Sequence, residues 1–176
     1  MAGDSRLPDW HDFYVIVGSA GAALIGIQFV VMTLIASRRK GTNEATIGAF
    51  GSPTIMSFAN ALLISAVMCM PWPSLLGVKV AATLISAAGL IHGCVAIRSA
   101  KRQDDYQPVW EDWLWYMILP IAAHLTLLGA AFWLDRDAHL ALFLVAACTL
   151  GLLLLGVRNA WDSVTHIVIT GSNGHQ

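Results

Sequence analysis

Charged residues are scarce in this sequence. Asp, Glu, Lys and Arg make up 12% of its 176 residues, whereas 57% are hydrophobic. An ordinary soluble domain has roughly 25% charged residues, so a chain this apolar needs lipid around it. The ten basic and eleven acidic residues leave a net charge of -1, which gives no electrostatic basis for binding nucleic acid. The first partner to expect is therefore the lipid bilayer.

The sequence also lacks the patterns of enzymes and metal sites. Its three cysteines, Cys69, Cys94 and Cys148, are too far apart for a C-x-x-C motif. There is no H-E-x-x-H, no glycine-rich phosphate loop and no G-x-S-x-G. Every Asp and Glu lies outside the long apolar runs. We expect no enzymatic activity, no bound metal and no resident cofactor.

Long apolar runs dominate what is present. About 20 apolar residues are needed to cross about 30 Å of hydrocarbon, and five runs have this length or nearly so. They cover about 13–37, 45–70, 75–97, 113–134 and 138–157, and 157–168 has the two faces of an interfacial amphipathic helix. The sequence therefore predicts an all-α membrane protein, with residues 1–176 forming a single domain, a bundle of five transmembrane helices.

The basic residues predict the orientation of this bundle. Seven of them follow the first, third and fifth runs, at Arg38, Arg39, Lys40, Arg98, Lys101, Arg102 and Arg158. The other three, Arg6, Lys79 and Arg136, fall on the opposite side. Because cytoplasmic loops carry an excess of Lys and Arg, we expect the N-terminus outside and the C-terminus in the cytoplasm.

Two runs carry small residues at the spacing that lets helix backbones approach closely. The first has Gly18-x-x-x-Ala22-x-x-x-Gly26, and the third has Gly89-x-x-x-Gly93. Such small residues favour helix packing inside lipid. These two stripes could pack on each other or on a neighbouring subunit, and the pattern alone does not choose between the two.

Four polar side chains lie at membrane depth, where each needs a partner or water. They are Gln28, Asn60, His92 and His124. One interpretation makes them hydrogen-bonding contacts between helices, and a second makes some of them line a hydrated path. A third makes the two histidines ligands of a haem. It is disfavoured because they lie about 9 Å and about 16 Å from the cytoplasmic ends of their runs, at about 1.5 Å per residue.

Three stretches of the chain are similar to a known group of proteins. They are Gly156-Val157-Arg158-Asn159-Ala160-Trp161-Asp162, Trp10-x-x-Phe13, and the run from Gly21 to Val30. With these stretches the chain resembles a group of small, largely uncharacterised bacterial multi-spanning membrane proteins. The resemblance implies a multi-pass protein of the bacterial inner (plasma) membrane, and it carries over no catalytic residue.

Two functions from different classes follow from these observations. The first hypothesis is a homo-oligomeric, channel-like or pore-like protein in which Gln28, Asn60 and His124 face a hydrated interior. The alternative is an accessory membrane subunit that binds a protein partner at the cytoplasmic face. The residues expected on that partner surface are Arg102, Asp105, Arg158 and Asp162. A haem-binding membrane redox protein is a remote alternative.

Overall fold

Helices make up the computed structural model, which describes residues 7–38, 44–100 and 110–172. No strand occurs within these ranges. In chain order they hold a 3-10 turn at Pro8–Trp10, α1 (His11–Arg38), α2 (Glu44–Cys69), α3 (Leu75–Ala100), α4 (Trp110–Trp113), the π-helix η2 (Leu114–Ile118), α5 (Leu119–Trp133) and α6 (Ala138–Ser172). The prediction of an all-α protein is confirmed.

Four of these helices are long and apolar enough to cross a membrane. The spans are His11–Leu34, Leu75–Arg98, Leu114–Trp133 and Ala138–Thr165. The described apolar part of α2, Pro53–Cys69, is shorter than the other four. Four spans therefore define a multi-pass membrane protein, and the fifth span stays a prediction, as does the orientation.

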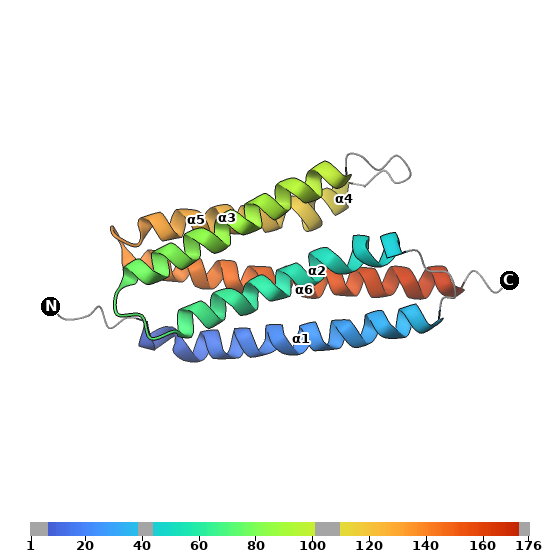
Figure 1. Ribbon diagram of the computed structural model, residues 1–176, viewed down its shortest axis with the longest axis horizontal. Helices are drawn as coiled ribbons and strands as arrows, with labels where there is room; N and C mark the ends of the chain where they lie inside the picture. Colours follow the sequence, from blue (N-terminus) through green and yellow to red (C-terminus); the bar gives the residue numbers. More distant parts are fainter. Residues whose placement is uncertain (1–6, 39–43, 101–109, 173–176) are drawn as a thin grey trace.

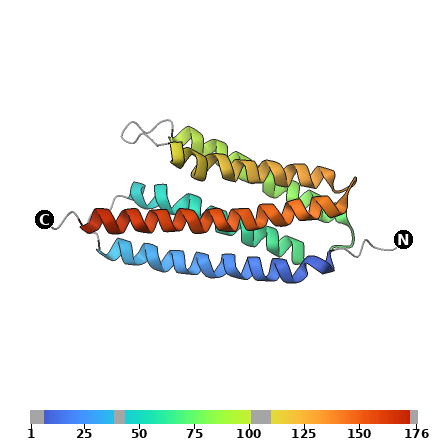
Figure 2. The same ribbon diagram turned by 180° about the vertical axis from the view of Figure 1, so that it is seen from behind.

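The helices form two groups, which we call the first leaf (α1, α2 and α6) and the second leaf (α3, α4, η2 and α5). Within the first leaf α1 packs on α2, and α2 packs on α6. In the second leaf α3 packs on α5, and α5 in turn packs on α6 to join the leaves. The views in Figures 1 and 2 agree that the leaves lie close together at one end and diverge toward α4.

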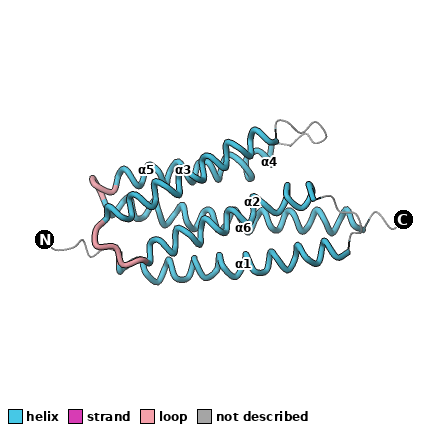
Figure 3. Tube along the Cα trace, viewed as in Figure 1, coloured by secondary structure: helices cyan, strands magenta, loops and turns pink. Residues whose placement is uncertain are grey.

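The closely packed end holds the turns, and we call it the turn end; the opposite end is the α4 end. Both the α2–α3 and the α5–α6 connections lie at the turn end (Figure 3). Pro71 and Pro73 follow α2 directly, and proline cannot continue a helix without losing a hydrogen bond. The Trp72 indole then donates to the Val67 carbonyl at 2.7 Å, which holds this connection against the end of α2.

Lys79, the charged residue inside the third run, lies at the turn end as well. Its ammonium pairs with the Asp135 carboxylate in the α5–α6 turn, and both side chains keep some exposure. A lysine near a helix end can place its charge at the membrane surface while its stem crosses apolar surroundings. The ion pair therefore links the start of α3 to the α5–α6 connection at the same end of the bundle.

Close contacts at glycines hold the first leaf together. A Cβ added at Gly18 would lie 2.9 Å from Cβ of Ser65 on α2, and one added at Gly156 of α6 would lie 2.5 Å from the Phe58 ring. Neither position has room for a side chain, so α1 and α6 each approach α2 as closely as a glycine allows. Phe58 itself is almost completely buried and packs where α2 meets α6.

Helix α6 holds both the last predicted span and the amphipathic segment. The sequence predicts a span over 138–157 that continues as an amphipathic helix at 157–168, and α6 runs unbroken from Ala138 to Ser172. No proline lies in this stretch. Gly156 lies inside the helix, where the absence of a side chain makes room for the Phe58 ring. The amphipathic segment is thus the continuation of the last span into the α4 end of the bundle.

Candidate functional site

Asn60 and His124 meet between the two leaves. The Asn60 amide nitrogen on α2 lies 3.4 Å from Nε2 of His124 on α5. His124 is 3% exposed, and its other ring nitrogen, Nδ1, is buried without a hydrogen-bond partner. Two polar side chains predicted at membrane depth are therefore brought together.

Gly89 provides the place for the His124 ring. A Cβ added at Gly89 would overlap the ring atoms of His124, and one added at Gly93 would lie 2.8 Å from Ile121. The Gly89-x-x-x-Gly93 stripe of α3 thus packs on α5 of the same chain. His92 lies three residues from Gly89 on this helix and is close enough to interact electrostatically with His124.

Asn159 is the most unusual polar residue of the interior. Its side chain is completely buried, at 0% exposure, and neither Nδ2 nor Oδ1 has a hydrogen-bond partner. Its backbone carbonyl accepts the Ser163 hydroxyl at 2.9 Å, which leaves the side-chain amide without a partner. An unpaired buried amide lowers the free energy of unfolding by roughly 1–3 kcal/mol. Packing alone therefore does not explain an asparagine at this position.

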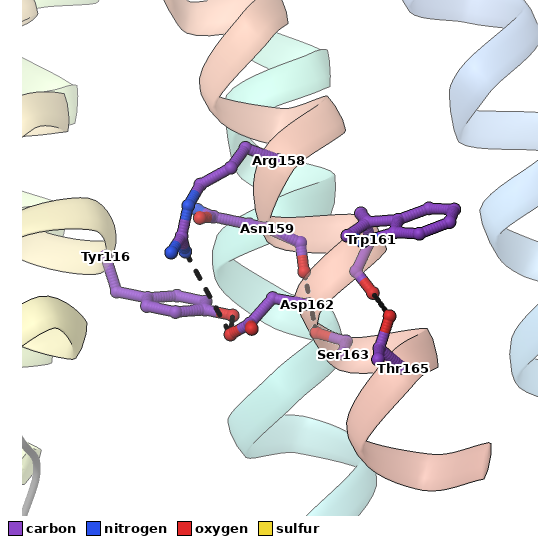
Figure 4. Close-up of polar contacts among 7 residues, drawn as sticks. All are labelled: Tyr116, Arg158, Asn159, Trp161, Asp162, Ser163 and Thr165. Carbon is purple, nitrogen blue, oxygen red and sulfur yellow. Dashed lines mark hydrogen bonds and ion pairs between the residues drawn. The ribbon is translucent and has the colours of Figure 1, made fainter. Parts of the chain in front are cut away.

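Tyr116 and Asp162 connect the leaves near the α4 end. The Tyr116 hydroxyl donates to the Asp162 carboxylate at 3.1 Å, and an Arg158 nitrogen lies 4.0 Å from the same oxygen. The Arg158 guanidinium also lies 4.4 Å from the centre of the Trp115 ring. Figure 4 shows Arg158, Asn159 and Asp162 reaching from α6 toward Tyr116, whereas Trp161 extends to the other side.

A π-helix positions Trp115 and Tyr116. It covers Leu114–Ile118, and the Leu119 N–H bonds to the Leu114 carbonyl five residues back. Pro120 follows at once and has no N–H to bond to the Tyr116 carbonyl in an α-helical pattern. The wider turn adapts the chain to this missing donor. Such π-helical turns are frequent at functional sites.

Two polar contacts join the leaves, Asn60 with His124 and Tyr116 with Asp162, and Asn159 lies between them in depth on α6. We call these five residues the polar seam. Their relative depths along the bundle can be counted from the contact of Gly156 with Phe58, which places these residues of α6 and α2 at one level. At about 1.5 Å per residue, Asn159 lies about 7 Å from the level of Asn60 along the bundle, and Asp162 about 4.5 Å further toward the α4 end. The seam thus spans part of the bundle's depth.

Three predicted packing or polar residues lie elsewhere. Gln28 is buried at 5% exposure, but it belongs to α1, which packs on α2 and α6. Ala22 is exposed and Gly26 has open space beside it. The small residues of α1 that meet another helix are Gly18 and Gly21, against α2, so α1 and α3 are not each other's main partners in the chain.

The predicted partner surface is only partly described. Arg102 and Asp105 lie outside the described residues. Arg158 and Asp162 are described, and they form the expected i,i+4 pair. Both also contact the π-helix of the second leaf, which assigns them a role inside the chain.

Sequence reasoning missed Asn159 and Tyr116 as candidates. The signal for Asn159 was its register: it lies three residues after Gly156 and seven after Leu152, and all three are buried on one side of α6. The part of the chain that the structure describes has further unpartnered buried hydroxyls at Tyr14 and Ser65, but these lie toward the turn end of the first leaf.

The fold and its four spans define a helical, multi-pass integral membrane protein. No family model, no curated protein and no solved structure matches the chain. The resemblance to small bacterial membrane proteins therefore stays a prediction. What can be said of function rests on the residues themselves.

Proposed function

We propose that this chain is a channel-like membrane protein whose path follows the polar seam between its leaves. The observation that carries the proposal is Asn159, a fully buried amide with two unpartnered polar atoms. It lies between the Asn60–His124 contact and the Tyr116–Asp162 hydrogen bond. A permeating polar species, or the water that accompanies it, would supply the partners that this amide lacks.

The energetics favour a path over simple helix packing. A hydrogen bond between helices needs two partners, and Tyr116 with Asp162 satisfies that description. Asn159 does not, because its amide has no hydrogen-bond partner among the described residues. In a structural role an apolar residue of similar shape would serve at lower cost. An amide at this position is useful when something polar passes it.

The path proposed here differs from the one expected from the sequence. Asn60 and His124 remain on it, and Asn159 takes the place of Gln28, which is buried within the first leaf. Both leaves contribute polar groups, so one chain supplies the path. We further propose that copies associate through the exposed small residues of α1, Ala22 and Gly26.

Flux through liposomes tests this proposal. Purified protein in liposomes should pass a small ion or solute, and Asn159→Leu and Asn60→Leu should each reduce the flux at least about tenfold. Thr126→Leu is the matched control, because Thr126 is exposed on α5 and bonds only to the Ala122 carbonyl. We expect its flux to equal that of the original protein.

Two outcomes of the flux measurement would overturn the proposal. They are the absence of any flux from folded protein and unchanged flux in both Asn variants. Gln28→Leu separates the two paths: a loss of flux in this variant, with flux retained in Asn159→Leu, would place the path inside the first leaf.

The second candidate function is an accessory subunit that binds a protein partner near the α4 end. The observation that favours it is Trp161, whose side chain is 74% exposed and turns away from the polar seam (Figure 4). Co-purification tests it: a partner that is lost in Trp161→Ala and retained in Val157→Ala would support this role. Isolation of the chain without any partner would count against it.

A further inference from the structure

The polar seam is closed by a side chain at the level of His124. The imidazole is 3% exposed, with the backbone of Gly89 directly on one side and the Asn60 amide 3.4 Å from Nε2. A hydrated ion or a solute could pass this level only if the ring left its place. A proton needs no such opening, because it can be carried by the ring itself.

We infer that the species conducted along the polar seam is the proton, with His124 as the residue that relays it. This inference rests on the proposed function and names its permeant. Imidazole suits the task because each of its two nitrogens can bind a proton, and the neutral ring carries one. In His124 one nitrogen faces Asn60, and the other is buried without a partner.

The transfer conserves charge and atoms. With the Asn60 amide donating to Nε2, the neutral ring of His124 carries its proton on Nδ1. A proton delivered by water binds Nε2 as the Asn60 amide gives way, which forms an imidazolium. The Nδ1 proton then leaves to a water molecule on the other side of the ring. The neutral ring that remains carries its proton on Nε2. Rotation of the ring turns this N–H to the exit side, and uptake of a second proton at Nδ1, release of the proton from Nε2 and a second rotation restore the starting state.

The electrostatic surroundings of His124 fit a relay of single protons. From α3 the nearby titratable group is His92, and from α2 the ring meets the neutral Asn60. On α6 the charged groups are Arg158 and Asp162, which pair with each other. They lie about 6 Å and about 12 Å nearer the α4 end, at about 1.5 Å per residue. Among the described residues no carboxylate contacts the ring, so nothing holds the imidazolium permanently in place.

Proton flux into liposomes tests the inference. Vesicles contain a pH-sensitive dye, and a potassium gradient with valinomycin supplies the driving potential. We expect dye acidification with the original protein, and a reduction of at least about tenfold in His124→Gln, which keeps a polar side chain but cannot carry a proton. His139→Gln is the matched control, because His139 is an exposed histidine at the turn end of α6; its flux should be unchanged.

Three results separate this inference from the proposed function. Flux of potassium, sodium or glycerol without proton flux would overturn the proton as permeant and leave the channel standing. No flux of any species would overturn both. Proton flux unchanged in folded His124→Gln would overturn the relay. If this variant fails to fold, the ratio of proton to sodium flux in the original protein decides, since a ring that blocks hydrated ions requires sodium flux to be at background.

Discussion

At the scale of single residues, Asn159 departs furthest from ordinary membrane packing among the described residues, because both polar atoms of its side chain lack a partner. Most buried hydroxyls bond to the carbonyl four residues earlier on their own helix, as Ser86, Thr149 and Ser163 do. Asn159 differs, because its amide has neither a donor nor an acceptor partner in the part of the chain that the structure describes. A residue with unmet hydrogen-bonding capacity at this depth is where function and stability are expected to conflict.

Asn159→Leu should reveal that conflict. Leucine has nearly the shape of asparagine and leaves no polar atom unpaired, so the free energy of unfolding should stay the same or rise by up to about 2 kcal/mol. Flux should fall in the same variant. Denaturant titration in detergent measures the first quantity. A loss of more than about 2 kcal/mol would mean that the amide is partnered in the native protein.

Gly89→Ala tests whether the His124 ring packs directly against the backbone of α3 at Gly89. A methyl group there would overlap the imidazole, and forcing extra volume into a packed interior costs about 1–3 kcal/mol. Gly151→Ala is the control, because nothing lies within 4 Å of that position; it should be neutral or stabilising by about 0.5–1 kcal/mol. Equal effects of the two substitutions would contradict the close contact between α3 and α5.

At the scale of elements, the two small-residue stripes have different roles. The stripe on α3 packs on α5, whereas α1 uses Gly18 and Gly21 toward α2 and leaves Ala22 and Gly26 outside. The faces differ because, at 3.6 residues per turn, each step of four residues rotates the stripe by about 40°. The stripe therefore begins against α2 at Gly18 and turns progressively away from it at Ala22 and Gly26. The outward part of the stripe is free for contact with lipid or with a second copy.

Gly26→Leu distinguishes these two surroundings. If copies pack at this position, a leucine separates their backbones, and the protein should shift toward the monomer by at least about tenfold in dissociation constant. Val30→Leu, on an exposed position of the same helix, should leave the association unchanged. Cross-linking and sedimentation in detergent measure the shift. An unaltered oligomeric distribution in Gly26→Leu would show that this part of α1 faces lipid.

At the scale of the whole molecule, the two leaves are joined firmly at the turn end and diverge toward α4 (Figure 1). Short connections and the Lys79–Asp135 ion pair hold the turn end. Toward α4 the leaves are bridged by the Tyr116–Asp162 hydrogen bond and by Arg158 on Trp115. Each such polar bridge contributes about 0.5–1.5 kcal/mol, so the α4 end is where the leaves separate most easily.

The orientation of the molecule is testable by cysteine labelling. In a background without Cys69, Cys94 and Cys148, a membrane-impermeant reagent added to intact cells should label Asp137→Cys at the turn end. It should label Trp110→Cys at the α4 end only after the membrane is opened. Both positions are exposed. The reverse pattern would contradict the orientation predicted from the excess of Lys and Arg near the α4 end.

The sequence by itself determined that this is an all-helical membrane protein and where most of its helices begin and end. Apolar runs of about 20 residues have no other stable environment than lipid, and Pro71 and Pro73 end α2 by local chemistry. Pro120 acts locally in the same way, because it has no N–H to bond to the Tyr116 carbonyl, and a π-helix lies there. These properties depend on residues close together in the chain.

Only the tertiary structure decided which polar groups meet. Asn60 and His124 are far apart in sequence, as are Tyr116 and Asp162. Helical periodicity predicts which face of a helix a residue lies on, but it does not predict which other helix packs against that face. Gln28 and Asn159 show the consequence: both are polar and buried, yet Gln28 lies on α1 and Asn159 lies on the side of α6 that holds Gly156. The rotation and pairing of helices are set by contacts such as Gly89 with His124 and Gly156 with Phe58, which depend on the shapes of two surfaces at once.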